Sequence, residues 1–297
     1  MELPEELVDH HVHIALEEDL AKRGDLTSET VVPQSARARG RIFAKQEGVL
    51  AGIALAIAAF RACDPECDIE VLAEDGTQLE TGSEVLKVQG TARGLLAAER
   101  TALNFLQRLS GVASLTARFV HAVRGTGATI LETRKTTPGL RSLQKYAVRV
   151  GGGVNHRFGL FDRILLKENH FALAGNGMDP EGYQKTVELA VSTGGRYGPV
   201  TVEVRDLEEA KAAALGGADV LLLDNMTQET LHDTVIAIRE FSRGLTQDVL
   251  LEASGGITLE TAGLIAAAGV DRLSVGALTH SAPALDLSML MDEMRSA

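Results

Sequence analysis

Basic side chains gather in three short motifs in the middle of the chain, and their types suit the binding of a small anion. The motifs are Thr133-Arg134-Lys135, His156-Arg157 and Lys167, and each lies at or near the end of a short apolar run. Like charges that converge in a cleft repel one another unless an anion lies among them. Arginine offers a planar fork to a carboxylate, whereas lysine acts as a point charge, so this mixture fits a ligand with carboxylates and phosphates. The alternative for any single cation is a solvated surface residue or an ordinary ion pair.

Two carboxylates form an acidic counterpart to these cations. Glu203 ends the run Val-Thr-Val-Glu, and Asp224 ends the run Val-Leu-Leu-Leu-Asp. Carboxylates in such positions can hold Mg²⁺, bind sugar hydroxyls or stabilise a developing cation. The structural alternatives are a salt bridge to a nearby lysine and, for Asp224, the cap of a following helix.

Two glycine-containing segments near the C-terminus are suited to phosphate. Ser254-Gly255-Gly256 joins an apolar run to a helix predicted from residue 259, and Val275-Gly276-Ala277 follows the next apolar run. Glycines let the backbone approach a phosphate closely, and a helix N-terminus adds amides and a positive dipole end. An ordinary strand-to-helix turn is the alternative for either segment alone. Together they predict a phosphate cradle of the kind that late loops form in many barrels.

The elements that must position these residues alternate regularly in the second half of the chain. Strand-like runs occur at residues 128–133, 163–166, 200–204, 220–223, 249–251 and 272–275. Helix-length segments lie between most of them, at residues 140–149, 180–192, 207–215, 228–241 and 259–268. This alternation is typical of parallel βα units. Because no Gly-x-Gly-x-x-Gly follows the first strand and the reactive residues collect at strand ends, we predict a barrel rather than a dinucleotide-binding sheet.

The first half of the chain predicts a different, α+β arrangement. Residues 1–30 have helical spacing, and short strand-like runs occur at residues 38–45, 69–73 and 85–88. An apolar helix is expected at residues 51–62, and one or two helices at residues 94–120.

Composition limits the classes of function. The chain has 297 residues and a formal net charge of −12, and it lacks tryptophan and basic runs, so we expect no nucleic-acid partner. The longest uncharged stretch is shorter than the ~20 residues of a membrane span, and the acidic start does not resemble a secretory signal. With only Cys63 and Cys67, a disulfide framework is not expected and a cytoplasmic location is predicted.

A cluster of histidines near the N-terminus allows a competing metal hypothesis. His10, His11 and His13 include a His-x-His pair, which can hold zinc in hydrolase barrels. However, this run precedes every predicted barrel strand and continues into an amphipathic helical segment, so helix-face histidines are favoured. Cys63 and Cys67 are interpreted as plain thiols.

Four longer motifs resemble one known family. They are Glu-Arg-Thr-Ala-Leu-Asn at 99–104, Glu-Thr-Arg-Lys-Thr-Thr-Pro-Gly at 132–139, Gly-Gly-Gly-Val-Asn-His-Arg at 151–157 and Leu-Lys-Glu-Asn-His at 166–170. With Glu-Asp-Leu at 18–20, Gly-Asp-Leu-Thr at 24–27 and the later acidic and glycine segments, they resemble quinolinate phosphoribosyltransferases over almost the whole chain.

The resemblance implies an α/β fold with two parts. An N-terminal α/β sandwich domain at residues 1–112, joined by the C-terminal tail from about residue 280 to 297, would accompany an incomplete parallel βα (TIM-like) barrel at residues 113–279. It implies transfer of the phosphoribosyl group of 5-phosphoribosyl 1-diphosphate to quinolinate with decarboxylation, which gives nicotinate mononucleotide in NAD biosynthesis. It also implies Mg²⁺ and a homo-oligomer, dimer or hexamer, whose site is shared between subunits.

The resemblance further assigns roles to the candidate residues. Arg134, His156, Arg157 and Lys167 would bind quinolinate, with Arg100 supplied by the neighbouring subunit. Lys135, beside Thr133, would contact the phosphoribosyl substrate, whose phosphate would lie at Ser254, Gly255, Gly256, Val275, Gly276 and Ala277. Glu203 and Asp224 would hold ribose hydroxyls and the metal, and together with Lys135 they are the predicted catalytic residues. The remaining alternatives are a phosphoribosyltransferase for another ring acid, a paralogue from a molybdenum-transport locus and a non-catalytic binding barrel.

Overall fold

The computed structural model describes residues 3–245 and 248–294, and the chain divides into two compact units. The first comprises Met1–Ala117, Ser142–Gly152 and Ala282–Ala297, and the second comprises Arg118–Arg141 and Gly153–Ser281. The division falls within one continuous helix, α4 (Ala92–Ala122), and so does the boundary predicted at residue 112. The chain therefore passes from one unit to the other inside a hydrogen-bonded helix rather than a loop.

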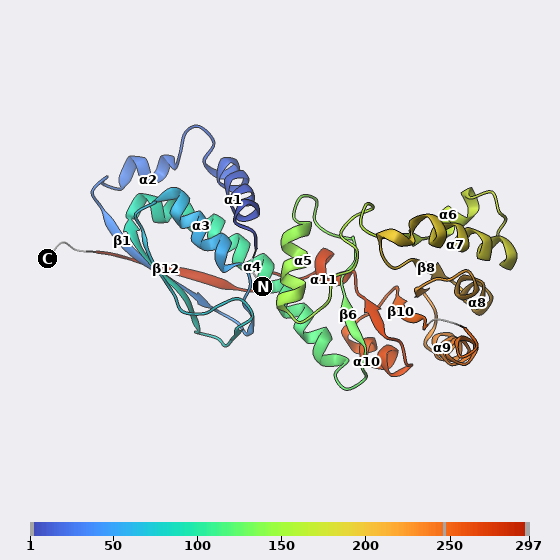
Figure 1. Ribbon diagram of the computed structural model, residues 1–297. Helices are drawn as coiled ribbons and strands as arrows, with labels where there is room; N and C mark the ends of the chain where they lie inside the picture. The colour runs from blue at the N-terminus through green and yellow to red at the C-terminus, as the bar shows by residue number, and fades with distance from the viewer. Residues whose placement is uncertain (1–2, 246–247, 295–297) are drawn as a thin grey trace. The chain divides into compact units, whose positions relative to one another are not determined.

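An antiparallel sheet with strand order β12-β1-β5-β3 forms the centre of the first unit. Its strands are β1 (Arg37–Ala44), β3 (Asp68–Val71), β5 (Glu84–Thr91) and β12 (Leu287–Glu293). Alternate residues of β1, including Ala38 and Ile42, are buried, as expected for a strand with one face on a hydrophobic core. The C-terminal β12 lies beside β1 in Figure 1, and Leu287 pairs with Ala44. The tail of the chain thus completes the sheet of the N-terminal unit.

The helices of this unit are α1 (Glu5–Leu20), α2 (Leu26–Val31), α3 (Ile53–Cys63), the first part of α4 and most of α5 (Arg141–Val150). Helices α3 and α4 lie along the sheet in Figure 1, and α1 contacts α3. The short strands β2 (Gly48–Val49) and β4 (Gln78–Leu79) pair with each other. The helical segment predicted at residues 1–30 is interrupted, because Asp25 caps α2 by accepting hydrogen bonds from the amides of Thr27 and Ser28. The helix expected at residues 94–120 is a single one. The predicted barrel range, residues 113–279, includes α5, of which residues 142–150 group with the first unit by their contacts.

A parallel six-stranded sheet with order β6-β11-β10-β9-β8-β7 forms the second unit. Its strands are β6 (Thr129–Leu131), β7 (Leu165–Leu166), β8 (Thr201–Val204), β9 (Val220–Asp224), β10 (Leu250–Ser254) and β11 (Arg272–Ser274). All six were predicted from apolar, β-branched runs. Strands β6 and β7 end the strand order and are not paired with each other, so the parallel sheet is an incomplete barrel, as predicted.

Helices follow the strands of the second unit and cover the sheet (Figure 1). They are α6 (Glu168–Leu173), α7 (Pro180–Gly194), η1 (Gly195–Tyr197), α8 (Leu207–Leu215), α9 (Gln228–Ser242), α10 (Leu259–Ala267) and α11 (Ala277–His280). The side chains of Asp206 and Thr227 cap α8 and α9 by accepting hydrogen bonds from backbone amides. Among the described residues, no helix has both the length and the apolar character needed to cross a membrane.

Candidate active site

The strand register places the predicted site residues at one edge of the parallel sheet. Ser254 is level with Asp224 on one side and with Ser274 on the other, and Ser274 is level with Leu131. The segment 133–135 therefore begins just beyond the end of β6, and Gly276 just beyond the end of β11. Because carboxyl ends of parallel strands meet at one rim, residues far apart in sequence gather there.

Arg157 and Arg134 form the cationic centre of the second unit. Arg157 is 7% exposed, and its Nη1 donates a hydrogen bond of 3.0 Å to the carbonyl oxygen of Arg163. Burial, and then repulsion by the guanidinium of Arg134, lowers the pKa of Arg157, and Asp162 opposes this only in part. Within the part of the chain that the structure describes, the Nε of Arg134 is buried and has no hydrogen-bond partner. Among the described residues, neither Arg134 nor Arg157 forms an ion pair with an acidic side chain. Two clustered guanidinium groups without acidic partners form a site for an anion.

His156 is held between two buried carboxylates. Its Nδ1 accepts a 2.7 Å hydrogen bond from the amide of Arg157, and its Nε2 lies 3.4 Å from Oε1 of Glu252. The His156 amide donates to Oε1 of Glu132, and Ser274 Oγ donates to Glu252. The sequence predicts a substrate contact for His156, which stays a prediction; in the ligand-free chain both ring nitrogens have protein partners. His156 therefore fixes the backbone from which Arg157 projects.

Lys167 and Glu203 come together directly at the ends of β7 and β8. The Lys167 ammonium donates to Oε2 of Glu203, although the two residues are 36 positions apart in the chain. Behind them, the hydroxyl of buried Tyr183 donates a 3.0 Å hydrogen bond to the carbonyl oxygen of Glu203. Tyr183 stacks on Phe171 with ring centroids 3.6 Å apart, and burial raises its pKa, so the hydroxyl keeps its proton. Sequence reasoning missed Tyr183, and its place in the helix at 180–192 gave no signal.

Lys135 lies on a well-fixed backbone beside the last glycine segment. Its amide donates to Thr133 Oγ1, and its carbonyl oxygen accepts from Thr279 Oγ1 at 2.8 Å. A Cβ placed on Gly276 would come within 3.1 Å of His280 Nε2 and 3.2 Å of Lys135 Cδ. His280, which the sequence analysis did not single out, therefore lies next to Lys135. Val275 is 1% exposed, so only its backbone can face a ligand.

Asp224 and the Ser254-Gly255-Gly256 segment lie on adjacent strand ends. Oδ2 of Asp224 accepts a 2.7 Å hydrogen bond from Nδ2 of Asn225. Gly255 has φ +95°, and a Cβ there would lie 2.1 Å from Oδ1 of Asn225, so only glycine fits. A Cβ on Gly256 would meet no atom within 4 Å, which leaves its backbone open to a ligand. Helix α10 begins at Leu259, three residues after Gly256, and Thr258 is its N-cap residue.

Arg100 differs from the other candidates because it belongs to the first unit. The sequence predicts that Leu95, Ala98 and Ala102 bury one face of its helix and leave Arg100 outside. The structure confirms this, since the three apolar residues are buried and Arg100 is exposed.

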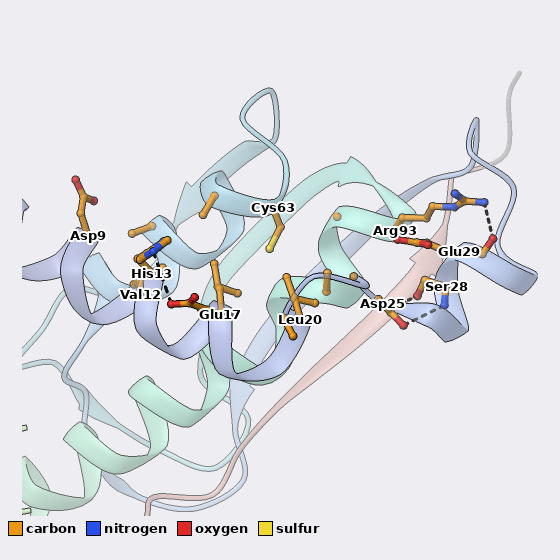
Figure 2. Close-up of a pocket in the computed structure, with 17 residues that line it drawn as sticks. Asp9, Val12, His13, Glu17, Leu20, Asp25, Ser28, Glu29, Cys63 and Arg93 are labelled. Atoms are coloured by element: carbon orange, nitrogen blue, oxygen red, sulfur yellow. Dashed lines mark hydrogen bonds and ion pairs between the residues drawn. The ribbon is translucent and has the colours of Figure 1, made fainter. Parts of the chain in front are cut away.

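A pocket of about 810 Å³ in the first unit contains none of the predicted site residues (Figure 2). Helices α1, α2, α3 and the start of α4 line it, and its polar residues include Glu17, Asp25 and Arg93. His13 lies there at 4.0 Å from Glu17, while His11 Nδ1 bonds to the carbonyl oxygen of Leu7. Within residues 3–245 and 248–294, no three His, Cys, Asp or Glu residues are grouped to hold a metal ion.

Comparisons with known proteins agree with this arrangement. The model of the quinolinate phosphoribosyl transferase N-terminal domain matches residues 25–110, and that of the C-terminal domain matches residues 112–290. The nicotinate-nucleotide pyrophosphorylase (carboxylating) of Mycobacterium leprae is 44% identical over 278 residues, which cover 93% of this chain and 94% of that protein. A probable enzyme of the same name from Bacillus subtilis is 40% identical over 266 residues, 90% of this chain and 87% of that protein.

Solved structures give the same result. The crystal structure of NadC from Streptococcus pyogenes superposes with a TM-score of 0.89 at 38% identity and covers 99% of this chain and 100% of that one. The nicotinate-nucleotide pyrophosphorylase from Francisella tularensis has a TM-score of 0.87 at 35% identity, with 98% of each chain covered. On its motifs, its fold and these similarities, the chain belongs to the quinolinate phosphoribosyltransferase family.

Proposed function

We propose that this chain transfers the phosphoribosyl group of 5-phosphoribosyl 1-diphosphate to quinolinate, with loss of CO₂, at the carboxyl edge of its parallel sheet. The product is nicotinate mononucleotide, which serves NAD biosynthesis. The observation that carries the proposal is the pair Arg134 and Arg157, in which buried Arg157 is repelled by Arg134. The carboxylates Glu203 and Asp224 lie near the carboxyl ends of β8 and β9 in the same sheet. A dianionic ring acid relieves the repulsion, and a sugar that develops positive charge is stabilised by the carboxylates.

Quinolinate has two adjacent carboxylates, and the cations supply two kinds of partner for them. Arg134 and Arg157 offer guanidinium forks, and Lys167 offers a point charge at the next strand end. In the ligand-free chain Lys167 is paired with Glu203, so the substrate must share Lys167 with that carboxylate. His156 contributes by holding Arg157 in place.

The phosphoribosyl substrate fits the ends of the middle strands of the sheet, β8 to β11. The backbones of Ser254, Gly255, Gly256, Val275, Gly276 and Ala277 would hold the 5-phosphate, as glycine segments at late barrel loops do. Lys135 would neutralise the diphosphate, with Thr133 fixing its backbone. Glu203 and Asp224 would bind the ribose hydroxyls.

The residues present also fit a Mg²⁺ ion that arrives with the diphosphate. Magnesium prefers oxygen ligands and keeps several waters, so one or two protein carboxylates suffice when a substrate supplies phosphate oxygens. Glu203 and Asp224 end the neighbouring strands β8 and β9 and provide such a pair. When bound, the ion neutralises the charge of the leaving diphosphate.

The chemistry then needs placement more than proton transfer. The bond between the anomeric carbon and the diphosphate oxygen breaks, the ring nitrogen bonds to that carbon, and diphosphate leaves with the electron pair. The ring nitrogen is now cationic, so the C–C bond to the neighbouring carboxylate can break, releasing CO₂ and leaving the electron pair on a ring carbon that takes a proton from water. Arg134, Arg157 and Lys167 orient the ring, and the carboxylates stabilise the positive sugar.

The proposal includes a homo-oligomer, a dimer or a hexamer, in which Arg100 of a neighbouring copy reaches the quinolinate site. Arg100 is exposed in the first unit, and the second unit exposes Leu160 at 73% and Phe161 at 80%. Exposed apolar side chains of this size favour burial against another chain. A cytoplasmic location is also part of the proposal, and the free thiols of Cys63 and Cys67 are compatible with it.

A direct assay tests the function. Purified protein is incubated with quinolinate, 5-phosphoribosyl 1-diphosphate and Mg²⁺, and nicotinate mononucleotide, diphosphate and CO₂ are measured together. We expect all three in equal amounts, and no product when nicotinate replaces quinolinate, because nicotinate lacks one of the two carboxylates. Folded protein that makes no nucleotide from quinolinate, or prefers nicotinate, would refute the proposal.

A further inference from the structure

Asn225 directly follows Asp224 and has an unusual backbone conformation. Its φ is +53°, and Ala21 is the other non-glycine residue with positive φ among the described parts of the chain. The left-handed region is sterically unfavourable for an L-residue, and asparagine tolerates it better than most. Surrounding contacts must therefore hold Asn225 in this conformation, and such positions concentrate at functional sites.

Two hydrogen bonds connect Asn225 to both parts of the proposed sugar-phosphate site. Its Nδ2 donates to Oδ2 of Asp224 at 2.7 Å, and its backbone amide donates to the carbonyl oxygen of Ser254 at 2.9 Å. A Cβ on Gly255 would lie 2.1 Å from Asn225 Oδ1 and 3.0 Å from its backbone nitrogen. Asn225 is thus in close contact with the Asp224 carboxylate and with the Ser254-Gly255 backbone at once.

We propose that Asn225 is a positioning residue for the phosphoribosyl substrate. Its side-chain amide fixes one oxygen of Asp224, and its backbone amide fixes the end of β10, so the carboxylate and the phosphate cradle keep one relative geometry. This inference rests on the proposed function, in which Asp224 and the cradle bind the same substrate. Quinolinate binds at the cationic part of the edge, so its affinity does not depend on Asn225.

The backbone conformation alone does not require asparagine. Glycine adopts positive φ without steric cost, so Asn225→Gly keeps the backbone and removes only the amide donor. Asn225→Asp keeps the shape of the side chain, but it replaces the donor with a carboxylate next to Asp224. A purely structural role predicts that glycine restores activity, whereas a positioning role predicts that it does not.

The test compares Asn225→Gly and Asn225→Asp with the wild type and with Asn176→Asp. Asn176 lies in another loop of the same unit, where its Nδ2 donates to Thr186 Oγ1, so its variant controls for the added charge. We measure kcat and KM for each substrate, and quinolinate affinity by calorimetry. We expect kcat/KM for 5-phosphoribosyl 1-diphosphate to fall about tenfold in Asn225→Gly and further in Asn225→Asp. Quinolinate affinity should stay within twofold, and Asn176→Asp should match the wild type.

Wild-type kcat/KM in both Asn225 variants would overturn the inference, as would a glycine variant that alone retains full activity. Equal losses for both substrates would also overturn it, since they indicate general damage to the fold. Asp224→Ala separates this inference from the function itself. If Asp224→Ala is inactive while the Asn225 variants are normal, only the positioning role fails. If Asp224→Ala is fully active, both the role of Asp224 in the proposed function and the positioning role of Asn225 fail.

Discussion

Replacing Arg157 with methionine should separate substrate affinity from folding stability. Methionine fills a similar length of side chain and removes the charge and the guanidinium fork. A hydrogen bond to a charged group contributes about 1.5–3 kcal/mol, and about 1.4 kcal/mol corresponds to a tenfold change in affinity. We therefore expect the dissociation constant of quinolinate to rise roughly 10- to 100-fold in Arg157→Met.

The stability of the folded protein should change little, because the free site holds Arg157 at a cost that the substitution removes. Burial and Arg134 lower its pKa, which for a base means that folding weakens proton binding. The charged form then destabilises the folded state at every pH below the folded pKa, and neutral pH lies in that range. The neutral methionine removes this penalty and loses the 3.0 Å bond to the Arg163 carbonyl oxygen. We expect the thermal midpoint to stay within about 4 °C of the wild type.

Calorimetry with quinolinate and thermal unfolding of the ligand-free protein check the two parts. Arg196→Met is the matched control, since Arg196 is an exposed residue of the same unit that lies 4.8 Å over the ring of Tyr197. Arg196→Met should change neither the quinolinate affinity nor the thermal midpoint. Unchanged quinolinate affinity in Arg157→Met, or a large loss of stability together with affinity, would contradict the assignment of Arg157 to the anion site.

Three further predictions concern the acidic residues, the buried tyrosine and the assembly. Glu203→Ala and Asp224→Ala should each lower kcat roughly 100-fold with little change in quinolinate affinity, because they face the sugar; Glu208→Ala, on an exposed side chain paired with Lys211, is the control, and wild-type turnover in both site variants would be contrary to their roles. Tyr183→Phe removes a buried hydrogen bond to Glu203 and should lower the free energy of unfolding in urea by about 0.5–1.5 kcal/mol; no change would mean that the bond contributes nothing. Arg100→Ala and Lys135→Ala should be inactive alone and recover roughly a quarter of wild-type activity when mixed as dimers, since random pairing gives half mixed dimers with one intact site each; no recovery after verified subunit exchange would place Arg100 outside its neighbour's site.

The strands and helices of the second unit could be predicted from sequence because their signals are local. The helix expected at residues 207–215 has the same bounds as α8, since Asp206 caps its start and Gly216 follows its end. Strand β12 was not predicted as a strand, because Leu287–Glu293 becomes one by pairing with β1, more than 240 positions away in the chain. The grouping of residues 142–152 with the first unit was missed for a similar reason. An amphipathic pattern shows that a helix buries one face, but not against which partner.

For the candidate site, the sequence predicts which residues lie at strand ends, but it does not predict which of them are in contact. Position at a strand end placed Lys167 and Glu203 at one edge, but their contact depends on β7 lying next to β8. The two carboxylates around His156 were missed, because Glu132 follows β6 and Glu252 lies within β10, and no local pattern connects these two segments. Residue type predicts which chemistry is available, whereas the order of strands in the sheet decides which groups meet.

The distribution of ion pairs explains how a chain with net charge −12 can bind a dianion. Several basic side chains elsewhere are matched by acids, as in the pairs Arg41–Glu84, Lys185–Glu181 and Arg239–Asp271. Such exposed pairs add little to stability, and they leave little positive field on the surface. Arg134 and Arg157 have no such acidic partner among the described residues, and the burial of Arg157 and of Arg134 Nε reduces screening by water. The local potential at the sheet edge is therefore set by which cations lack an acid, and the sum over the whole chain does not determine it.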